Sequence, residues 1–331
     1  MKKKIKENQV TWGIIGAGDV CEKKSAPAMK KIPGSNIRAI MRRNLEKAKD
    51  YAYRHQIPHW YTDAAQIIND PQINAIYIAT PPESHAELAI AAARAGKPVY
   101  VEKPMARTYD ECTVMVQAFE KADIPLYVAY YRRALPNFLK VKELVESGVI
   151  GEIRMVTIEM YKPLESNEAL KDDPWRLDPN IAGGGHFYDL ASHQLDILDY
   201  IIAPITQATG YSTNQAGRYK ADDIVTSSFV FENGVLGSGS WCFTTGQAAE
   251  KEITTIIGTA GTINFATFGS EVTVESDSTG RKVFDFEMPE HIQQPLIEQI
   301  IGDLLGKNLS PSTGVSGART NDIMEKMCQP V

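Results

Sequence analysis

Short apolar runs alternate with helix-length segments over about the first 130 residues, and this alternation limits the fold more than any other feature of the chain. The first run, residues 10–15, ends at a glycine-rich turn, and helical spacing continues from residue 19 to residue 31. Strands that alternate with helices of ~10–15 residues are typical of βαβ units in a parallel sheet, whose crossovers are nearly always right-handed. We therefore predict a doubly wound Rossmann domain in residues 1–129, with further strands at 37–41, 75–79, 98–101 and 126–130 and helices at 45–55, 64–68, 83–95 and 109–121.

The pattern changes in the second half, where expected strands follow one another without helices between them. Such runs indicate a largely antiparallel sheet. The predicted fold class is therefore α/β, with the Rossmann domain followed by an α+β domain in residues 130–331. Its expected strands include 153–161, 224–231, 235–243, 253–257 and 272–275, and its expected helices are 137–147, 186–202 and 292–305.

The composition excludes several classes of protein. The 331 residues are 43% hydrophobic and 23% charged, which is ordinary for a globular chain and enough for about two domains. Asp and Glu number 41 against 35 Lys and Arg, and the net charge of −6 argues against nucleic acid and anionic membranes as partners. No apolar run approaches the ~18 residues of a membrane span, and the basic N-terminus lacks the apolar segment of a signal peptide.

The cysteines indicate neither a metal centre nor a disulfide framework. Cys21, Cys112, Cys242 and Cys328 lie far apart, and none belongs to a Cys-x-x-Cys pair. We therefore assign no metal ligands. A reducing compartment, the cytoplasm, fits this cysteine usage best.

A glycine motif follows the first expected strand and opens the first expected helix, which is the context that a dinucleotide fingerprint requires. Gly16 permits the tight turn, and Gly18 lets a pyrophosphate approach the backbone at the helix N-terminus. Cys21 replaces the third glycine, at a position that needs only a small side chain for packing. A plain strand-to-helix turn is the alternative. The residues expected to bind the dinucleotide here are Gly16, Ala17, Gly18, Asp19 and Val20.

The end of the second expected strand indicates which nicotinamide cofactor is preferred. A carboxylate ~20 residues beyond the glycines would bind the ribose 2′-hydroxyl of NAD. The sequence instead has Arg42 and Arg43 there, with no acid before Glu46. Guanidinium groups match a 2′-phosphate in charge and in fork geometry, so NADP(H) is favoured. NAD(H) is the alternative cofactor, because Arg42 and Arg43 are also explained as ordinary surface residues at the start of a helix.

Three longer segments carry a resemblance to a known family. Residues 79–85 read Ala-Thr-Pro-Pro-Glu-Ser-His, and residues 95–104 read Ala-Gly-Lys-Pro-Val-Tyr-Val-Glu-Lys-Pro. Residues 183–196 read Gly-Gly-Gly-His-Phe-Tyr-Asp-Leu-Ala-Ser-His-Gln-Leu-Asp. Over nearly its whole length the chain resembles the Gfo/Idh/MocA oxidoreductases, the family of glucose–fructose oxidoreductase and inositol dehydrogenase. Glu-Lys-Pro combined with Asp-x-x-x-His is specific to this pattern, whereas either motif alone is not.

The resemblance implies a large open sheet in the second domain, through which members pair as homodimers or homotetramers. It implies hydride transfer between a nicotinamide cofactor and a carbohydrate or polyol. Lys103, Asp189 and His193 match the family's catalytic positions, and the Lys103–Pro104 bond is expected to be cis. The positions that would line the cofactor are Thr80, Pro81, Glu102 and Lys103.

The same residues suit the chemistry without the family name. Lys103 follows a strand of the parallel sheet, and ligands of such sheets bind outside the carboxyl ends of the strands. Asp189 and His193 are four residues apart, which places them on one helix face. When a hydride leaves an alcohol carbon, a base must take the hydroxyl proton, and histidine titrates near neutral pH. The sequence leaves open whether Lys103 or His193 is that base, and whether Asp189 orients His193 or binds substrate.

Several residues have a weaker claim to the site. His85 either lies near the cofactor or caps the helix that follows Pro82. Tyr131, Trp175 and Arg176 offer flat faces and donors to a sugar, although ordinary packing explains them equally well. The function predicted is an NADP(H)-dependent oxidoreductase of a sugar, polyol or related hydroxy or keto compound. The alternatives left open are an NAD-dependent dehydrogenase of the same family, a glycosidase that retains its cofactor, and a non-catalytic regulator that senses dinucleotide.

Overall fold

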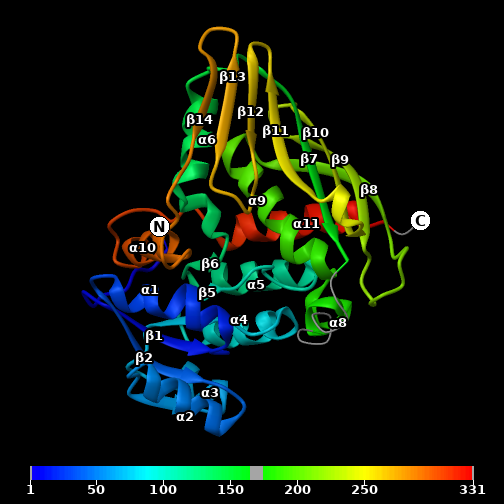
Figure 1. The fold of residues 1–331 in the computed structure, drawn as a ribbon. Helices are drawn as coiled ribbons and strands as arrows, with labels where there is room; N and C mark the ends of the chain where they lie inside the picture. Colours follow the sequence, from blue (N-terminus) through cyan, green and yellow to red (C-terminus); the bar gives the residue numbers. More distant parts are fainter. Residues whose placement is uncertain (1, 165–173, 330–331) are drawn as a thin grey trace. The chain divides into compact units, whose positions relative to one another are not determined.

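The computed structural model describes residues 2–164 and 174–329 and contains two compact units (Figure 1). The first unit comprises residues 1–134 and 289–318, and the second comprises residues 135–288 and 319–331. The sequence predicted a single division after residue 129. The difference arises because residues 289–318 return to the first unit, where Ser312 Oγ donates to the Val128 carbonyl at 2.7 Å.

A six-stranded parallel sheet forms the first unit, in the order β3-β2-β1-β4-β5-β6. Chain order reverses between β1 and β4, which is where doubly wound sheets open a crevice for ligands. The prediction of a Rossmann domain is confirmed. Strands β4 and β5 are buried along their whole length, as expected for a parallel sheet covered on both faces. The strands are β1 (Val10–Ile15), β2 (Ser35–Met41), β3 (His59–Tyr61), β4 (Ala75–Ile78), β5 (Val99–Val101) and β6 (Leu126–Val128).

The helices of the first unit lie close to the predicted positions, with one local difference. The helix predicted from residue 19 begins as a π-helical turn, η1 (Cys21–Ser25), before α1 (Ala26–Lys31). Helices α4 and α5 pack against one another (Figure 1). The remaining helical elements are α2 (Leu45–Arg54), α3 (Ala64–Asn69), η2 (Pro82–Ser84), α4 (His85–Arg94), α5 (Tyr109–Ala122), η3 (Tyr131–Ala134) and α10 (Gln294–Leu304).

The second unit is built on an eight-stranded sheet in the order β14-β13-β12-β11-β7-β10-β9-β8. Its neighbouring strands are antiparallel except for β7 and β10, which confirms the predicted mostly antiparallel sheet. Burial alternates along strands such as β9, since one sheet face is covered. The strands are β7 (Ile153–Pro163), β8 (Ile205–Thr213), β9 (Ile224–Phe231), β10 (Leu236–Thr245), β11 (Lys251–Gly258), β12 (Gly261–Phe265), β13 (Val272–Ser276) and β14 (Gly280–Phe284).

Helices α6 and α9 pack side by side in the second unit, and α6 also contacts β13 (Figure 1). The helix predicted from residue 186 begins as a π-helical turn, η5, and continues as α9. Among the described residues, no helix has the length and apolar character needed to cross a membrane. The helical elements are α6 (Pro136–Glu146), η4 (Pro174–Leu177), α8 (Pro179–Ala182), η5 (Phe187–Ala191), α9 (Ser192–Ile201), η6 (Gln247–Ala249) and α11 (Gly314–Met327), whose first residues belong to the first unit.

Candidate active site

The glycine turn joins the carboxyl ends of three strands of the parallel sheet. The backbone N–H groups of Gly16 and Ala17 donate to the Met41 carbonyl at the end of β2, at 3.0 and 3.3 Å. Gly16 has a φ of 87°, and a Cβ there would lie 2.8 Å from the backbone nitrogen of Thr80, just beyond β4. Both the left-handed backbone and the close approach require glycine at this position.

Beside Gly16, the turn leaves an open backbone surface that fits a pyrophosphate. A Cβ on Gly18 would meet nothing closer than the Gly16 carbonyl oxygen at 3.8 Å, so the missing side chain leaves the backbone accessible. The helical segment starts here, because Cys21 N–H donates to the Gly18 carbonyl at 3.0 Å. Asp19 is exposed and Val20 is half-buried beside it. Cys21 is fully buried, and burial raises the pKa of its thiol to about 12, which suits a small packing residue.

Arg42 and Arg43 directly follow the β2 end to which the glycine turn is bonded. The Arg42 N–H donates to the Tyr61 carbonyl at 3.2 Å, while its side chain is half-buried and that of Arg43 is exposed. Asn44 then caps α2 by accepting the Lys47 N–H at 2.9 Å. The two guanidinium groups are therefore carried by a backbone segment that is anchored next to the glycine turn.

His85 is buried completely, and its ring contacts backbone oxygens. Its Nε2 lies 2.7 Å from the Thr80 carbonyl, and its Nδ1 lies 3.2 Å from both the Pro104 and the Met105 carbonyls. Burial lowers the pKa of the imidazole. The ring thus connects the turn after β4 to the loop after β5, and it is enclosed by protein. Thr80 also accepts a hydrogen bond from Ser84 Oγ at 2.7 Å, and the neighbouring Pro81 is half-exposed.

The Glu-Lys-Pro motif lies in the loop that follows β5, and its Lys103–Pro104 peptide bond is cis. Glu102 is buried, and its Oε1 accepts hydrogen bonds from the Tyr77 hydroxyl at 2.6 Å and from Gln293 Nε2 at 2.7 Å. Its Oε2 accepts from the Lys103 backbone N–H at 3.3 Å. The sequence does not indicate Gln293 as a partner of Glu102, because 191 positions separate the two residues and no local motif marks Gln293.

In the second unit, three of the predicted site residues lie together. The Arg176 guanidinium sits 4.6 Å from the centre of the Trp175 ring, and its Nε is 3.7 Å from Asp189 Oδ2. Elements η4 and η5 supply these side chains, which are partly exposed. An arginine stacked on an indole and paired with a carboxylate offers both a flat face and polar groups to a ligand.

His193 and Tyr131 are both buried. His193 is 3% exposed in α9, and its ring lies 6.0 Å from that of Phe268 in an edge-to-face arrangement. The loop that carries Phe268 is held by Glu252, whose carboxylate accepts the Thr267 and Phe268 N–H groups at 2.6 and 3.1 Å. Tyr131, which belongs to the first unit, packs under the Arg132 guanidinium at 5.0 Å.

Polar and apolar side chains of α9 are buried alike. Asp196 and Ile197 are equally buried, because α9 is covered by protein on nearly every side. Asp189 differs from them, since it lies in the π-helical turn and stays partly exposed. π-helical turns recur at functional sites, because the extra residue changes where the side chains point.

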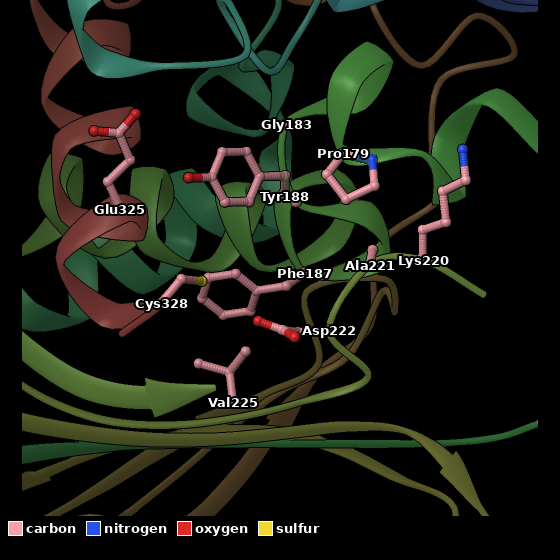
Figure 2. A pocket seen from close by; sticks show the side chains of 11 residues that line it. Pro179, Gly183, Phe187, Tyr188, Lys220, Ala221, Asp222, Val225, Glu325 and Cys328 are labelled. Atoms are coloured by element: carbon pink, nitrogen blue, oxygen red, sulfur yellow. The ribbon is translucent and has the colours of Figure 1, made fainter. Parts of the chain in front are cut away.

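A pocket of about 280 Å³ lies in the second unit next to this turn (Figure 2). Its wall is mixed, with the Tyr188 and Phe187 rings beside the carboxyl groups of Glu325 and Asp222. A Cβ on Gly184 would lie 2.1 Å from the Tyr188 ring, so a close approach explains that glycine. Over residues 2–164 and 174–329, no three His, Cys, Asp or Glu side chains are grouped as metal ligands would be.

Comparison with known proteins identifies the family. Residues 10–130 match the model of an oxidoreductase family with an NAD-binding Rossmann fold, and residues 138–264 match that of the GFO/IDH/MocA C-terminal domain. The chain is 38% identical to Oxidoreductase P35 of Formosa agariphila, over 97% of this chain and 99% of that protein. It is 30% identical to levoglucosan dehydrogenase of Pseudarthrobacter phenanthrenivorans, over 77% of this chain and 66% of that protein.

A similar solved structure is that of levoglucosan dehydrogenase in complex with NADH and levoglucosan. It shares 26% identity with this chain, covers 96% of each chain and has a TM-score of 0.85. The first matched family model covers the parallel sheet, with the glycine turn at its reversal of strand order. The second covers much of the eight-stranded sheet. The chain therefore belongs to the Gfo/Idh/MocA family of oxidoreductases with an NAD-binding Rossmann fold.

Proposed function

We propose that this oxidoreductase transfers a hydride between NADP(H) and a sugar, polyol or related hydroxy or keto compound. The observation that carries the proposal is the glycine turn at the β1–β4 reversal, with Lys103 just beyond the neighbouring strand β5. The similarity to levoglucosan dehydrogenase supports a carbohydrate as substrate.

Three side chains are proposed to handle the proton. A bound nicotinamide supplies the hydride acceptor or donor. Lys103 or His193 takes the hydroxyl proton during oxidation. Asp189 either orients His193 or binds the substrate. The Arg176 contact to Asp189 supports a ligand-facing role for that carboxylate, since both side chains are partly exposed.

The nucleotide is proposed to lie against residues 16–20 and to place its 2′-phosphate at Arg42 and Arg43. The open backbone at Gly18 and the anchored position of the two arginines support this assignment. His85 is proposed to act indirectly: its ring contacts backbone carbonyl groups and so holds the Thr80 turn and the Lys103 loop together. Thr80, Pro81 and Glu102 are proposed to line the nucleotide.

The substrate contacts proposed are Trp175, Arg176 and Tyr131. Contacts between Trp175, Arg176 and Asp189 support the first two, whereas the burial of Tyr131 favours a packing role beneath Arg132. Residues 164–185, which carry Trp175 and Arg176, are proposed to set substrate specificity, and they lie partly outside the described residues.

A homodimer or homotetramer is proposed as the assembly. Large apolar side chains on the second unit's strands are exposed, which supports burial against another copy; they include Met155, Tyr211, Leu236 and Val283. Light scattering of the purified protein tests the assembly. The free thiols of Cys21, Cys242 and Cys328 support a reducing compartment, and we propose the cytoplasm.

A panel of polyols, aldoses and keto-sugars, followed at the nicotinamide absorbance with NADP(H) and NAD(H), tests the function. We expect net oxidation or reduction of at least one carbohydrate class, faster with NADP(H). Tight nucleotide binding without turnover of any compound would favour the regulator. Release of sugar from a glycoside without net change in the cofactor would favour the glycosidase.

A further inference from the structure

A buried network within the first unit connects the Glu-Lys-Pro motif to a distant part of the chain. Gln293, which immediately precedes α10, donates from Nε2 to Glu102 Oε1 at 2.7 Å. The Tyr77 hydroxyl donates to the same oxygen at 2.6 Å. Gln293 is 0% exposed and Glu102 is 8% exposed. The carboxylate is therefore held by side chains from two separate segments.

Tyr100 determines which end of the Gln293 amide faces the carboxylate. Its hydroxyl donates to Gln293 Oε1 at 2.9 Å, so the NH₂ end is turned toward Glu102. Tyr77 and Tyr100 are direct neighbours in the register of β4 and β5, and their stacked rings lie 5.0 Å apart. Two adjacent strands of the sheet core thus anchor both ends of the network.

Over residues 2–164 and 174–329, the donors to Glu102 are a phenol, an amide and the Lys103 backbone N–H, all of them uncharged. They replace the hydration that the carboxylate loses on burial, without cancelling its negative charge. Because Oε2 accepts from Lys103 N–H, any rotation of the carboxylate disturbs the backbone that carries Lys103. In the part of the chain that the structure describes, the Gln293 side chain hydrogen-bonds Tyr100 and Glu102, so it can act on the Lys103 loop through Glu102.

We propose that Gln293 is a positioning residue for the nicotinamide nucleotide site. By holding Glu102 Oε1, it keeps the second carboxylate oxygen and the Lys103 backbone in the orientation that the nucleotide requires. The proposal rests on the proposed function, since it takes Glu102 to line the nucleotide.

Gln293→Glu is the informative variant, because it replaces the donor with a second carboxyl group of the same size. Two carboxyl groups in one buried site cannot both ionise readily. At pH 5.5 a protonated Glu side chain at 293 still donates to Glu102. At pH 8 the side chain is more often ionised, and its carboxylate then repels that of Glu102. Relative to wild type, we expect the Kd for NADPH to rise about tenfold at pH 8 and to recover largely at pH 5.5.

The pH dependence of the Kd for NADPH is interpreted with a matched control variant and with the other titratable groups near Glu102. Among the described residues, the Glu102 charge also acts on Cys21, His85, Tyr77 and Tyr100, and all four are unchanged in the variant. Gln299→Glu is the control, since Gln299 is exposed on α10 and accepts from Asn308 at 3.0 Å, as a carboxylate also can. The Kd for NADPH of Gln299→Glu, divided by that of wild type, should be the same at both pH values.

A swapped pair, Glu102→Gln with Gln293→Glu, separates positioning from packing. The amide then donates to the carboxylate from the opposite side, and Tyr77 can turn from donor to acceptor. We expect the swap to restore the melting temperature of the nucleotide-free protein. Its Kd for NADPH should equal that of Glu102→Gln alone, because Gln293 acts through the Glu102 carboxylate, which is absent from both variants. If the swap binds NADPH about tenfold more weakly than Glu102→Gln alone, Gln293 acts independently of Glu102 and the proposal is wrong.

The outcomes distinguish this proposal from the proposed function. If wild type binds neither NADPH nor NADH, the proposed function fails. If wild type binds and Gln293→Glu has the wild-type Kd at both pH values, the positioning role alone fails. Should the single variant not fold, as judged by circular dichroism, the swapped pair carries the test.

Discussion

His85 is the residue at which burial and hydrogen bonding conflict. Both ring nitrogens face carbonyl oxygens, but a neutral imidazole has one N–H, and burial opposes the second proton. The pKa of the folded-state ring is lowered by burial. Between that pKa and the unfolded value of ~6.5, the unfolded chain binds the additional proton. Stability therefore rises with pH in this window and is lost as the pH falls below ~6.5.

A His85→Gln variant should lose part of this pH dependence. We expect its melting temperature to change less than that of wild type between pH 7.5 and pH 5.5, although it is lower at pH 7.5. Thermal unfolding at both pH values measures the effect. His59→Gln, at a half-buried edge-strand position, is the control and should keep the wild-type slope. Parallel pH curves for wild type and His85→Gln would contradict the prediction.

Arg42 and Arg43 are expected to determine cofactor preference. Replacing both by Ala removes the charge offered to a 2′-phosphate, so the Kd for NADPH should rise about tenfold or more while that for NADH stays near wild type. Titration of each nucleotide at equal ionic strength measures this. Lys47→Ala, an exposed cation on α2, should change neither value. Tighter binding of NADH than NADPH by wild type would reverse our assignment.

Lys103 and His193 are expected to be required for turnover. Lys103→Met or His193→Ala should lower kcat by about 10²-fold or more, because general acid–base groups contribute at least that much. The Kd for the nucleotide is measured alongside, so that a loss of binding is not mistaken for a loss of chemistry. The controls are Lys47→Met and His59→Ala, which should keep wild-type kcat. Near-normal turnover in either active-site variant would remove that residue from the proposed mechanism.

At the scale of elements, the sequence predicted most helices and strands, and it missed the two π-helical turns. Elements η1 and η5 each insert a wider turn at the start of a predicted helix. A hydrophobic period of 3.6 residues averages over several turns, so one widened turn does not alter it detectably. Both turns occur in the motifs that the sequence marked for function, and they carry Cys21 and Asp189.

Helix α5 illustrates an element whose start is encoded locally. Thr108 Oγ1 accepts the Glu111 N–H at 3.2 Å, and the Glu111 carboxylate accepts the Arg107 N–H at 3.0 Å. Removing the cap with Thr108→Ala should lower the free energy of unfolding by about 1 kcal/mol. Chemical denaturation measures this loss, and Thr108→Ser should retain most of the stability. Equal losses in both variants would indicate that the threonine methyl group, rather than the hydroxyl, is responsible.

At the scale of the whole molecule, residues 289–318 complete the first unit. They supply Gln293 to Glu102 and Ser312 to the Val128 carbonyl, and α10 buries Leu296, Ile297 and Ile300. Residues 1–134 alone would expose the apolar surface that α10 covers and leave Glu102 without its amide donor.

Residues 1–134 expressed alone are therefore expected to show no cooperative thermal transition. Joined by a flexible Gly/Ser linker to residues 289–318, they should melt cooperatively and bind NADPH. Calorimetry and nucleotide titration compare the two proteins, and a linker ending in a scrambled 289–318 segment is the control. Cooperative melting of residues 1–134 without the segment would show that it is dispensable.

The sequence by itself determined the fold class, the family, and the glycine turn with its neighbouring arginines. Strand and helix periods are local properties, and Gly16 is required by backbone geometry that a short motif reports. Tertiary structure alone decided that Gln293 holds Glu102, that Arg176 contacts Asp189, and that residues 289–318 belong with the first unit. These features depend on packing between segments far apart in the chain, and no local pattern of residues encodes which distant segments meet.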